Sequence, residues 1–216
     1  FIMFCPETNK NKNTHAFKAK LIFTTYISLF KDRLFVGCCL LAGFSMACGL
    51  AYATLSPFIF HSQFHLSAIE YGWYTALAGF GAIIGRLINP WLIKRYNCKY
   101  ALWNGIICLS CGSLWLLGLY LFNFLFIPLI LVGIFLITAS QALVMPNSMS
   151  FALSPFHNRR GAASALYGSL ILSIAFVSSA TLSLFNHYGL LILIISYLIF
   201  TFLSIGVFLI NINNEV

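Results

Sequence analysis

Long uncharged, apolar runs alternate with short polar segments along most of this chain. Residues 34–60, 100–158 and 161–214 contain no Asp, Glu, Lys or Arg. A helix needs about 20 mostly apolar residues to cross a bilayer. The first run is therefore long enough for one crossing, and each of the other two for a pair. The pattern predicts an all-α membrane protein.

Turn-forming residues mark where the crossings are expected to end. Asn123 divides the second run, and Asn186-His187-Tyr188-Gly189 divides the third. Pro146-Asn147 is expected to end another helix, because proline lacks a backbone N–H. We predict six transmembrane helices, at about 34–60, 68–93, 100–121, 125–147, 161–184 and 190–210.

The N-terminal residues 1–33 are set apart from this bundle. They begin with a short apolar stretch, FIMFC, without an initial Met, and continue as a basic segment. We expect residues 1–33 to be the end of a preceding helix plus a central cytoplasmic loop, residues 34–216 to be a six-helix transmembrane bundle, and the sequence to be a fragment. Within the loop, Leu21 to Phe30 fits either an amphipathic helix at the lipid headgroups or a partly ordered linker.

The amino-acid composition, like the uncharged runs, indicates a membrane protein. Charged residues make up 7% of the chain and hydrophobic residues 61%, whereas soluble domains carry about 25% charge. Lys and Arg outnumber Asp and Glu by 12 to 4. The bases lie before the first predicted helix and in alternate loops, so they indicate orientation in the bilayer rather than binding of nucleic acid. Both ends and the basic loops are predicted to be cytoplasmic.

The cysteines and histidines offer no complete metal site. Cys108-x-x-Cys111 lacks a second ligand pair, and His61 and His65 lie in a loop without a third ligand. Cysteine in an apolar run behaves as a small buried hydrophobe. We therefore expect no disulfide, no metal, no cofactor and no enzymatic activity.

The second predicted helix carries a close-packing pattern and one base. Small residues four positions apart, Gly81 and Gly85, let helix backbones approach each other in lipid. Arg86 follows directly. Its side chain either extends to the cytoplasmic headgroups or makes a functional contact with a neighbouring helix.

A few polar residues lie within the apolar runs and are candidates for lining a substrate cavity. Polar groups at membrane depth are tolerated against protein or beside water. For any single one of them, helix packing is the simpler explanation. The candidates are Tyr52, Gln141, Asn147, Ser164 and Tyr167.

Several segments resemble one transporter family. Met145-Pro-Asn-Ser-Met-Ser-Phe-Ala-Leu-Ser-Pro-Phe156, followed by Arg160-Gly-Ala-Ala-Ser-Ala-Leu166, is similar to the segment joining the tenth and eleventh helices of major facilitator superfamily exporters. Cys5-Pro6-Glu7-Thr8 and Ser56-Pro57-Phe58 resemble the ends of the sixth and seventh helices in the bicyclomycin/chloramphenicol-resistance (Bcr/CflA) group. The resemblance covers nearly the whole chain. It implies the C-terminal half of a twelve-helix major facilitator fold.

The resemblance also implies a cytoplasmic gating loop. The superfamily's Gly-x-x-x-Asp-Arg-x-Gly-Arg-Lys loop has a degenerate second copy here, with Asn89 in place of the Asp and Pro90 in place of the Arg. These two replacements weaken the case for a charge-relay role at this loop, although Arg86 could substitute for the missing charge. The gating candidates are Gly85, Arg86, Asn89, Lys94 and Arg95.

The function that the resemblance implies is secondary active transport: proton-coupled multidrug efflux by alternating access, at the bacterial inner membrane, leading to antibiotic resistance. The implied partners are the lipid bilayer, a small amphipathic drug-like substrate and protons. No Asp or Glu lies well inside a predicted crossing, so proton coupling is expected to depend on the missing N-terminal half.

Two other functions remain open from the sequence. The membrane domain of an ATP-driven exporter also often has six helices, although no G-x-x-x-x-G-K-[ST] motif occurs here. A non-transporting remnant of a truncated transporter gene is the other possibility.

Overall fold

The structure, a computed structural model, describes residues 26–156 and 159–212. Apart from turns, these residues form helices, and six of the helices are long and apolar enough to cross a membrane. The all-α, six-helix prediction is therefore confirmed. A short helix at 26–31 precedes the others. The elements are α2 (Arg33–Ser62), α3 (Ala68–Arg95), α4 (Cys98–Leu121), α5 (Ile127–Leu153), α6 (Arg160–Ser183), the 3-10 helix η2 (Asn186–Tyr188), α7 (Leu190–Val207) and the π-helical turn η3 (Phe208–Ile212).

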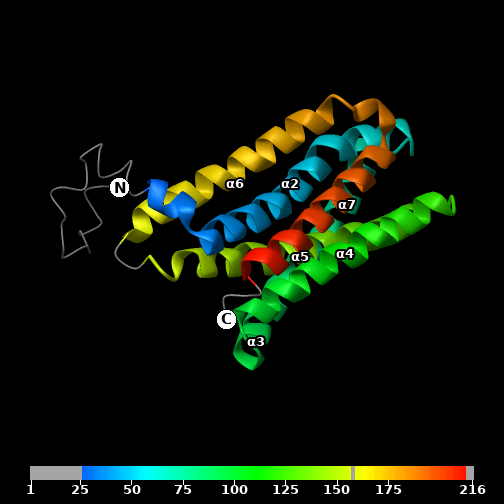
Figure 1. Cartoon of the computed structure of the whole chain (residues 1–216). Helices are drawn as coiled ribbons and strands as arrows, with labels where there is room; N and C mark the ends of the chain where they lie inside the picture. The colour runs from blue at the N-terminus through cyan, green and yellow to red at the C-terminus, as the bar shows by residue number, and fades with distance from the viewer. Residues whose placement is uncertain (1–25, 157–158, 213–216) are drawn as a thin grey trace, which may run out of the picture.

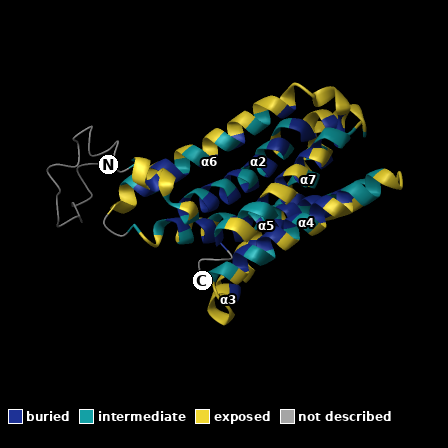
Figure 2. Ribbon diagram, in the orientation of Figure 1, coloured by how far each residue is buried: buried dark blue, intermediate teal, exposed yellow. Residues whose placement is uncertain are grey.

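Helices α2 and α5 form the centre of the bundle and pack against each other. Helix α6 packs mainly on α2, and α3 mainly on α5, so the order α3, α5, α2, α6 runs across the bundle. Helix α4 packs on α5 and α7, and α7 also contacts α2 (Figure 1). Figure 2 accordingly shows α2 largely buried and α6 exposed along much of its length. The two helices at the ends of this order, α3 and α6, are the least covered by the rest of the chain.

Polar side chains fix the starts of three helices. The Asp32 carboxylate accepts a hydrogen bond from the Phe35 backbone N–H at 2.8 Å and caps α2. Ser67 and Glu70 form a reciprocal capping box at the start of α3. Asn97 accepts from the backbone N–H of Tyr100 at 2.6 Å and caps α4. These caps satisfy N–H groups that a helix cannot satisfy itself.

Two turns, one between α4 and α5 and one before α7, need unusual backbone angles. Asn123, between α4 and α5, has a φ of 58°, which asparagine tolerates better than most residues. Gly189, before α7, has a φ of 57°. A Cβ there would also collide with the side chain of Gln63 from the end of α2, so glycine is required at this turn.

Helix α5 does not end at Pro146-Asn147 as the sequence suggested. It continues to Leu153, because membrane helices tolerate proline when other groups satisfy the backbone. Pro146 itself is exposed. The side chains of the next two residues, Asn147 and Ser148, donate hydrogen bonds to the carbonyls of Leu143 and Met145. Pro57 in α2 and Pro90 in α3 likewise lie inside helices.

Small residues hold the helices close, as the sequence predicted for Gly81 and Gly85. A Cβ at Gly81 would collide with the carbonyl oxygen of Phe135 in α5, and one at Gly85 would lie 2.7 Å from that of Ala139. On the other side of the bundle, a Cβ at Gly43 of α2 would lie 2.6 Å from Ile174 of α6. The backbones of α3 and α5 are therefore in direct contact, and the Ile174 side chain packs directly on the α2 backbone at Gly43.

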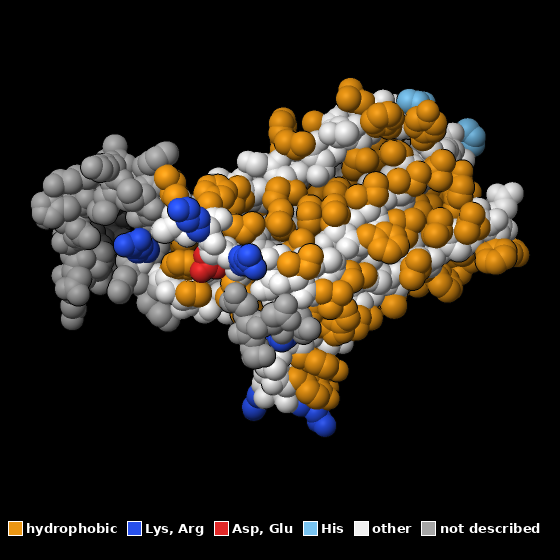
Figure 3. Space-filling model, viewed as in Figure 1, with side chains coloured by type: hydrophobic (Ala, Val, Ile, Leu, Met, Phe, Trp, Pro, Cys, Tyr) orange, Lys and Arg blue, Asp and Glu red, His pale blue; other side chains and the backbone are white. Residues whose placement is uncertain are grey.

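Charge separates the two ends of the bundle. The described bases at helix ends gather where α2, α4 and α6 begin and α3 ends, whereas the described histidines lie at the other end (Figure 3). This basic end comprises Lys31, Arg33, Lys94, Arg95, Lys99, Arg159 and Arg160. Most of the segment 1–33, including Cys5-Pro6-Glu7-Thr8 and the start of Leu21 to Phe30, lies outside the described residues.

Candidate functional site

Two of the candidate cavity residues, Tyr52 and Gln141, lie near the middle of the bundle where α2 meets α5. A Cβ at Gly49 of α2 would lie 2.8 Å from the amide nitrogen of Gln141, so this side chain rests against the α2 backbone. Tyr52 lies one turn further along α2, on the neighbouring part of its surface. Both side chains are half-buried. Neither the Gln141 amide nitrogen nor the Tyr52 hydroxyl forms a hydrogen bond of ordinary geometry with a described residue.

Further hydroxyls surround Tyr52. Those of Ser56 and of Thr75 from α3 lie close to it, and so does the fully buried Tyr197 from α7. The Tyr197 hydroxyl also has no hydrogen-bond partner among the described residues, and that of Thr75 has only its loose contact with Tyr52. Buried polar groups without partners are costly, so a hydrogen bond from water or from the polar part of a ligand would lower that cost.

Asn147 lies closer to the basic end and has its hydrogen bonds satisfied. Its amide nitrogen donates to the side-chain oxygen of Asn89 in α3 at 2.6 Å and to the carbonyl of Leu143 at 2.7 Å. Its side-chain oxygen accepts from the Cys98 thiol of α4 at 3.3 Å. Asn147 thus joins α3, α4 and α5. The structure brings a predicted cavity residue and a predicted gating residue, Asn89, into one buried contact.

Tyr167 connects α6 to the same stretch of α5. Its buried hydroxyl is hydrogen-bonded to that of Ser148, 2.8 Å away, and donates to the carbonyl of Met145 at 3.4 Å. Ser164 is half-buried, and its hydroxyl donates to the Gly161 carbonyl of its own helix at 3.0 Å. The five cavity candidates therefore lie in two groups, one at mid-bundle and one near the basic end.

The gating candidates belong to α3 rather than to a loop. Gly85 and Asn89 are buried against α5, whereas Arg86 and Lys94 are exposed. The Arg95 guanidinium lies over the rings of Trp91 and Tyr96, 5.6 and 5.8 Å from their centroids. Two members of this set thus pack helices together, and three face outward.

Sequence reasoning missed Thr75, Cys98, Ser148 and Tyr197. Thr75, Ser148 and Tyr197 lie in apolar runs, where hydroxyl groups are common and carry no distinctive spacing, and Cys98 lies beside Lys99 just before such a run. Only the pairing of helices reveals which of them meet. The same holds for Thr54 and Ser179, whose hydroxyls join α2 and α6 at 2.7 Å.

Three cavities lie away from the five cavity candidates. The largest, about 410 Å³, lies between the end of α2 and the start of α3 and is lined by residues such as Pro57, His61 and Tyr71. A second, about 250 Å³, lies between α6 and α7. The third, about 260 Å³, lies at the basic end, between the start of α4 and η3. No group of three potential metal ligands occurs among the described residues.

Comparison with known proteins now identifies the family. The family model for the Major Facilitator Superfamily matches residues 1–180, most of the chain. The chain belongs to the major facilitator superfamily.

A relative in sequence is named "Bicyclomycin resistance protein homolog", from Haemophilus influenzae. It is 20% identical over 169 residues, a stretch that covers 78% of this chain and 42% of the relative. The chain thus spans less than half the length of the curated relative it matches. Both findings confirm the resemblance to a drug exporter of the bicyclomycin-resistance type. Together with the six apolar helices, they make this an integral membrane protein from a family of transporters rather than enzymes.

Proposed function

We propose that this chain is the C-terminal half of a twelve-helix drug exporter, and that a second six-helix half covers its exposed α3 and α6. The observation that carries the proposal is the superfamily match of a six-helix chain that spans less than half of its relative. Exposed apolar side chains on α3 and α6, such as Leu87 and Phe176, support it. They would lie against the other half or against lipid.

The substrate proposed is a small, amphipathic compound, of the kind that the relative's name suggests. Among the described residues the only acids are Asp32 and Glu70, and both cap helix starts at the ends of the bundle. The mid-bundle group around Gln141 and Tyr52 offers hydrogen bonds without fixed charge. Such a site suits an uncharged polar group on a largely apolar molecule.

Proton coupling and alternating access are part of the same proposal. Export by this superfamily involves two halves rocking about a central site. An acid inside the membrane is the usual proton carrier, and this chain supplies none at that depth. The carrier would therefore lie in the other half. The family match does not favour the ATP-driven alternative.

Export by the complete reading frame that contains this chain tests the proposal. Gln141→Ala and Tyr52→Phe should each lower export of an amphipathic antibiotic, measured as the rate in inverted vesicles, by about fivefold, the worth of one hydrogen bond. Asn104→Ala is the matched control, because its amide donates to Tyr100 of its own helix. Unchanged export in both variants would remove this group from the substrate site.

An uncoupler distinguishes proton-driven export from ATP-driven export in the same vesicles. A protonophore should abolish export if protons drive it. Export that needs ATP and survives the protonophore would overturn the proposed mechanism. Export that fails with every tested drug while the chain stays folded would favour a non-transporting remnant.

A further inference from the structure

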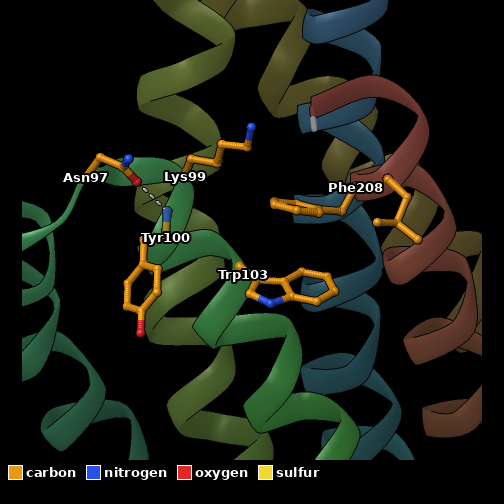
Figure 4. Close-up of a pocket in the computed structure, with 6 residues that line it drawn as sticks. Asn97, Lys99, Tyr100, Trp103 and Phe208 are labelled. Carbon is orange, nitrogen blue, oxygen red and sulfur yellow. Dashed lines mark hydrogen bonds between the residues drawn. The ribbon is translucent and has the colours of Figure 1, made fainter. Parts of the chain in front are cut away.

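A cavity at the basic end of the bundle takes no part in the sites described above. Its volume is about 260 Å³, and it lies between the start of α4 and the π-helical turn η3 (Figure 4). None of its lining residues is a cavity or gating candidate. They are Asn97, Lys99, Tyr100, Trp103, Phe208 and Leu209.

The floor of this cavity is apolar and built by two helices. The rings of Trp103 from α4 and Phe208 from η3 stack with centroids 4.8 Å apart. Phe208 is almost fully buried, whereas Leu209 beside it is 48% exposed. The wall therefore continues from the interior of the bundle to its outer surface. Ile107, one turn beyond Trp103 on α4, is also exposed and extends the apolar strip away from the basic end.

The mouth of the cavity is cationic. Figure 4 shows the Lys99 side chain reaching across the opening, toward the side on which Phe208 lies, with Trp103 beneath. Lys94 and Arg95 lie just ahead in the chain, at the end of α3, and none of the described residues that line the cavity is acidic. Asn97 caps the start of α4, so the positive end of the α4 dipole also points to this region.

We propose that this cavity binds one anionic phospholipid, with its phosphate at Lys99 and an acyl chain along Trp103, Phe208 and Leu209. A charged mouth above an apolar wall matches a molecule that is charged at one end and apolar along its length. The cavity lies at the ends of membrane-spanning helices, at the depth of the headgroups. Basic pockets between transmembrane helices at the cytoplasmic face are where anionic headgroups bind. A small soluble anion has no acyl chain and would gain nothing from contact with the apolar wall.

Native mass spectrometry of the full chain in detergent tests the proposal, with phosphatidylglycerol as the probe. Wild-type protein should retain phosphatidylglycerol more strongly than phosphatidylcholine. Lys99→Gln should weaken phosphatidylglycerol retention about fivefold, since one basic side chain near a membrane surface is worth about that factor. Lys99→Arg should keep it. Lys31→Gln is the matched control, because Lys31 is an exposed lysine at the same end that does not line the cavity.

Each other outcome is equally decisive. Equal losses in Lys99→Gln and Lys31→Gln would mean a general attraction of anionic lipid to the basic end and would overturn the site. Competition by glycerol phosphate at the lipid's concentration would reveal a small-anion site instead.

If Lys99→Gln lowers the thermal midpoint without lipid, Leu209→Gln provides the second variant, since Leu209 is half exposed. Unchanged retention in Leu209→Gln would contradict the proposed path of the acyl chain.

Discussion

Asn147 and Gln141 lie within two turns of each other on α5, yet their side chains are in opposite situations. Asn147 is buried and hydrogen-bonded to three helices, counting its own. The Gln141 amide nitrogen has no partner among the described residues. A residue whose hydrogen bonds are already satisfied stabilises the fold, whereas one that is unsatisfied has an interaction to offer. This distinction ranks Gln141 above Asn147 as a substrate contact.

Removing either partner of the Asn89–Asn147 pair should destabilise the bundle. Hydrogen bonds between transmembrane helices contribute on average about 0.6 kcal/mol and at most about 1.7 kcal/mol. We expect Asn89→Ala and Asn147→Ala each to lower the free energy of unfolding in micelles by about 1 kcal/mol. The double variant should lose less than the sum of the two, because both single changes break the same bond.

A control for this cycle is Asn104→Ala, whose amide bonds only within α4. It should leave the unfolding free energy nearly unchanged. Fully additive losses for Asn89→Ala and Asn147→Ala would show that the two amides do not interact in the folded protein.

At the scale of helices, the length of the apolar runs was enough to predict the six crossings. It was not enough for their ends. Pro146 was interpreted as the end of a helix, but α5 passes through it and continues to Leu153, because membrane-spanning helices tolerate an internal proline. Nor could periodicity show which helices are neighbours. The contact of Asn89 with Asn147 depends on α3 lying against α5, which is decided by tertiary packing of small residues.

Glycines of α3 allow a direct test of that packing. Gly85→Ala would place a methyl group 2.7 Å from the Ala139 carbonyl oxygen and 2.8 Å from the Ala142 Cβ. Overpacking of this kind costs about 1–3 kcal/mol, so the denaturant midpoint in micelles should fall. Gly79→Ala is the matched change on the same helix, because a Cβ there meets nothing within 4 Å. It should be neutral or slightly stabilising, since alanine favours helix over glycine.

Equal midpoints for Gly85→Ala and Gly79→Ala would show that α3 is not held against α5 by backbone contact. A lower midpoint for Gly79→Ala than for Gly85→Ala would mean that a different face of α3 packs on the bundle.

At the scale of the whole molecule, the described bases at helix ends gather at one end of the bundle (Figure 3). Loops at the other end contain histidines but no Lys or Arg. Because cytoplasmic loops retain an excess of Lys and Arg, the basic end should be cytoplasmic. The proposed lipid site, at Lys99, would then lie in the cytoplasmic leaflet. Both inferences depend on the same orientation, which is open to measurement.

Two exposed serines at opposite ends form a matched pair for that measurement. Ser62 at the end of α2 and Ser154 just after α5 each donate a hydrogen bond to a carbonyl of the preceding turn. In a variant without native cysteines, a membrane-impermeant maleimide should label Ser62→Cys in cells with a permeable outer membrane and an intact inner membrane. Ser154→Cys should react only after the inner membrane is opened, with a contrast of roughly tenfold or more. The reverse pattern would place the basic end outside and the proposed lipid site in the outer leaflet. Equal labelling of both would contradict an odd number of crossings between the two serines.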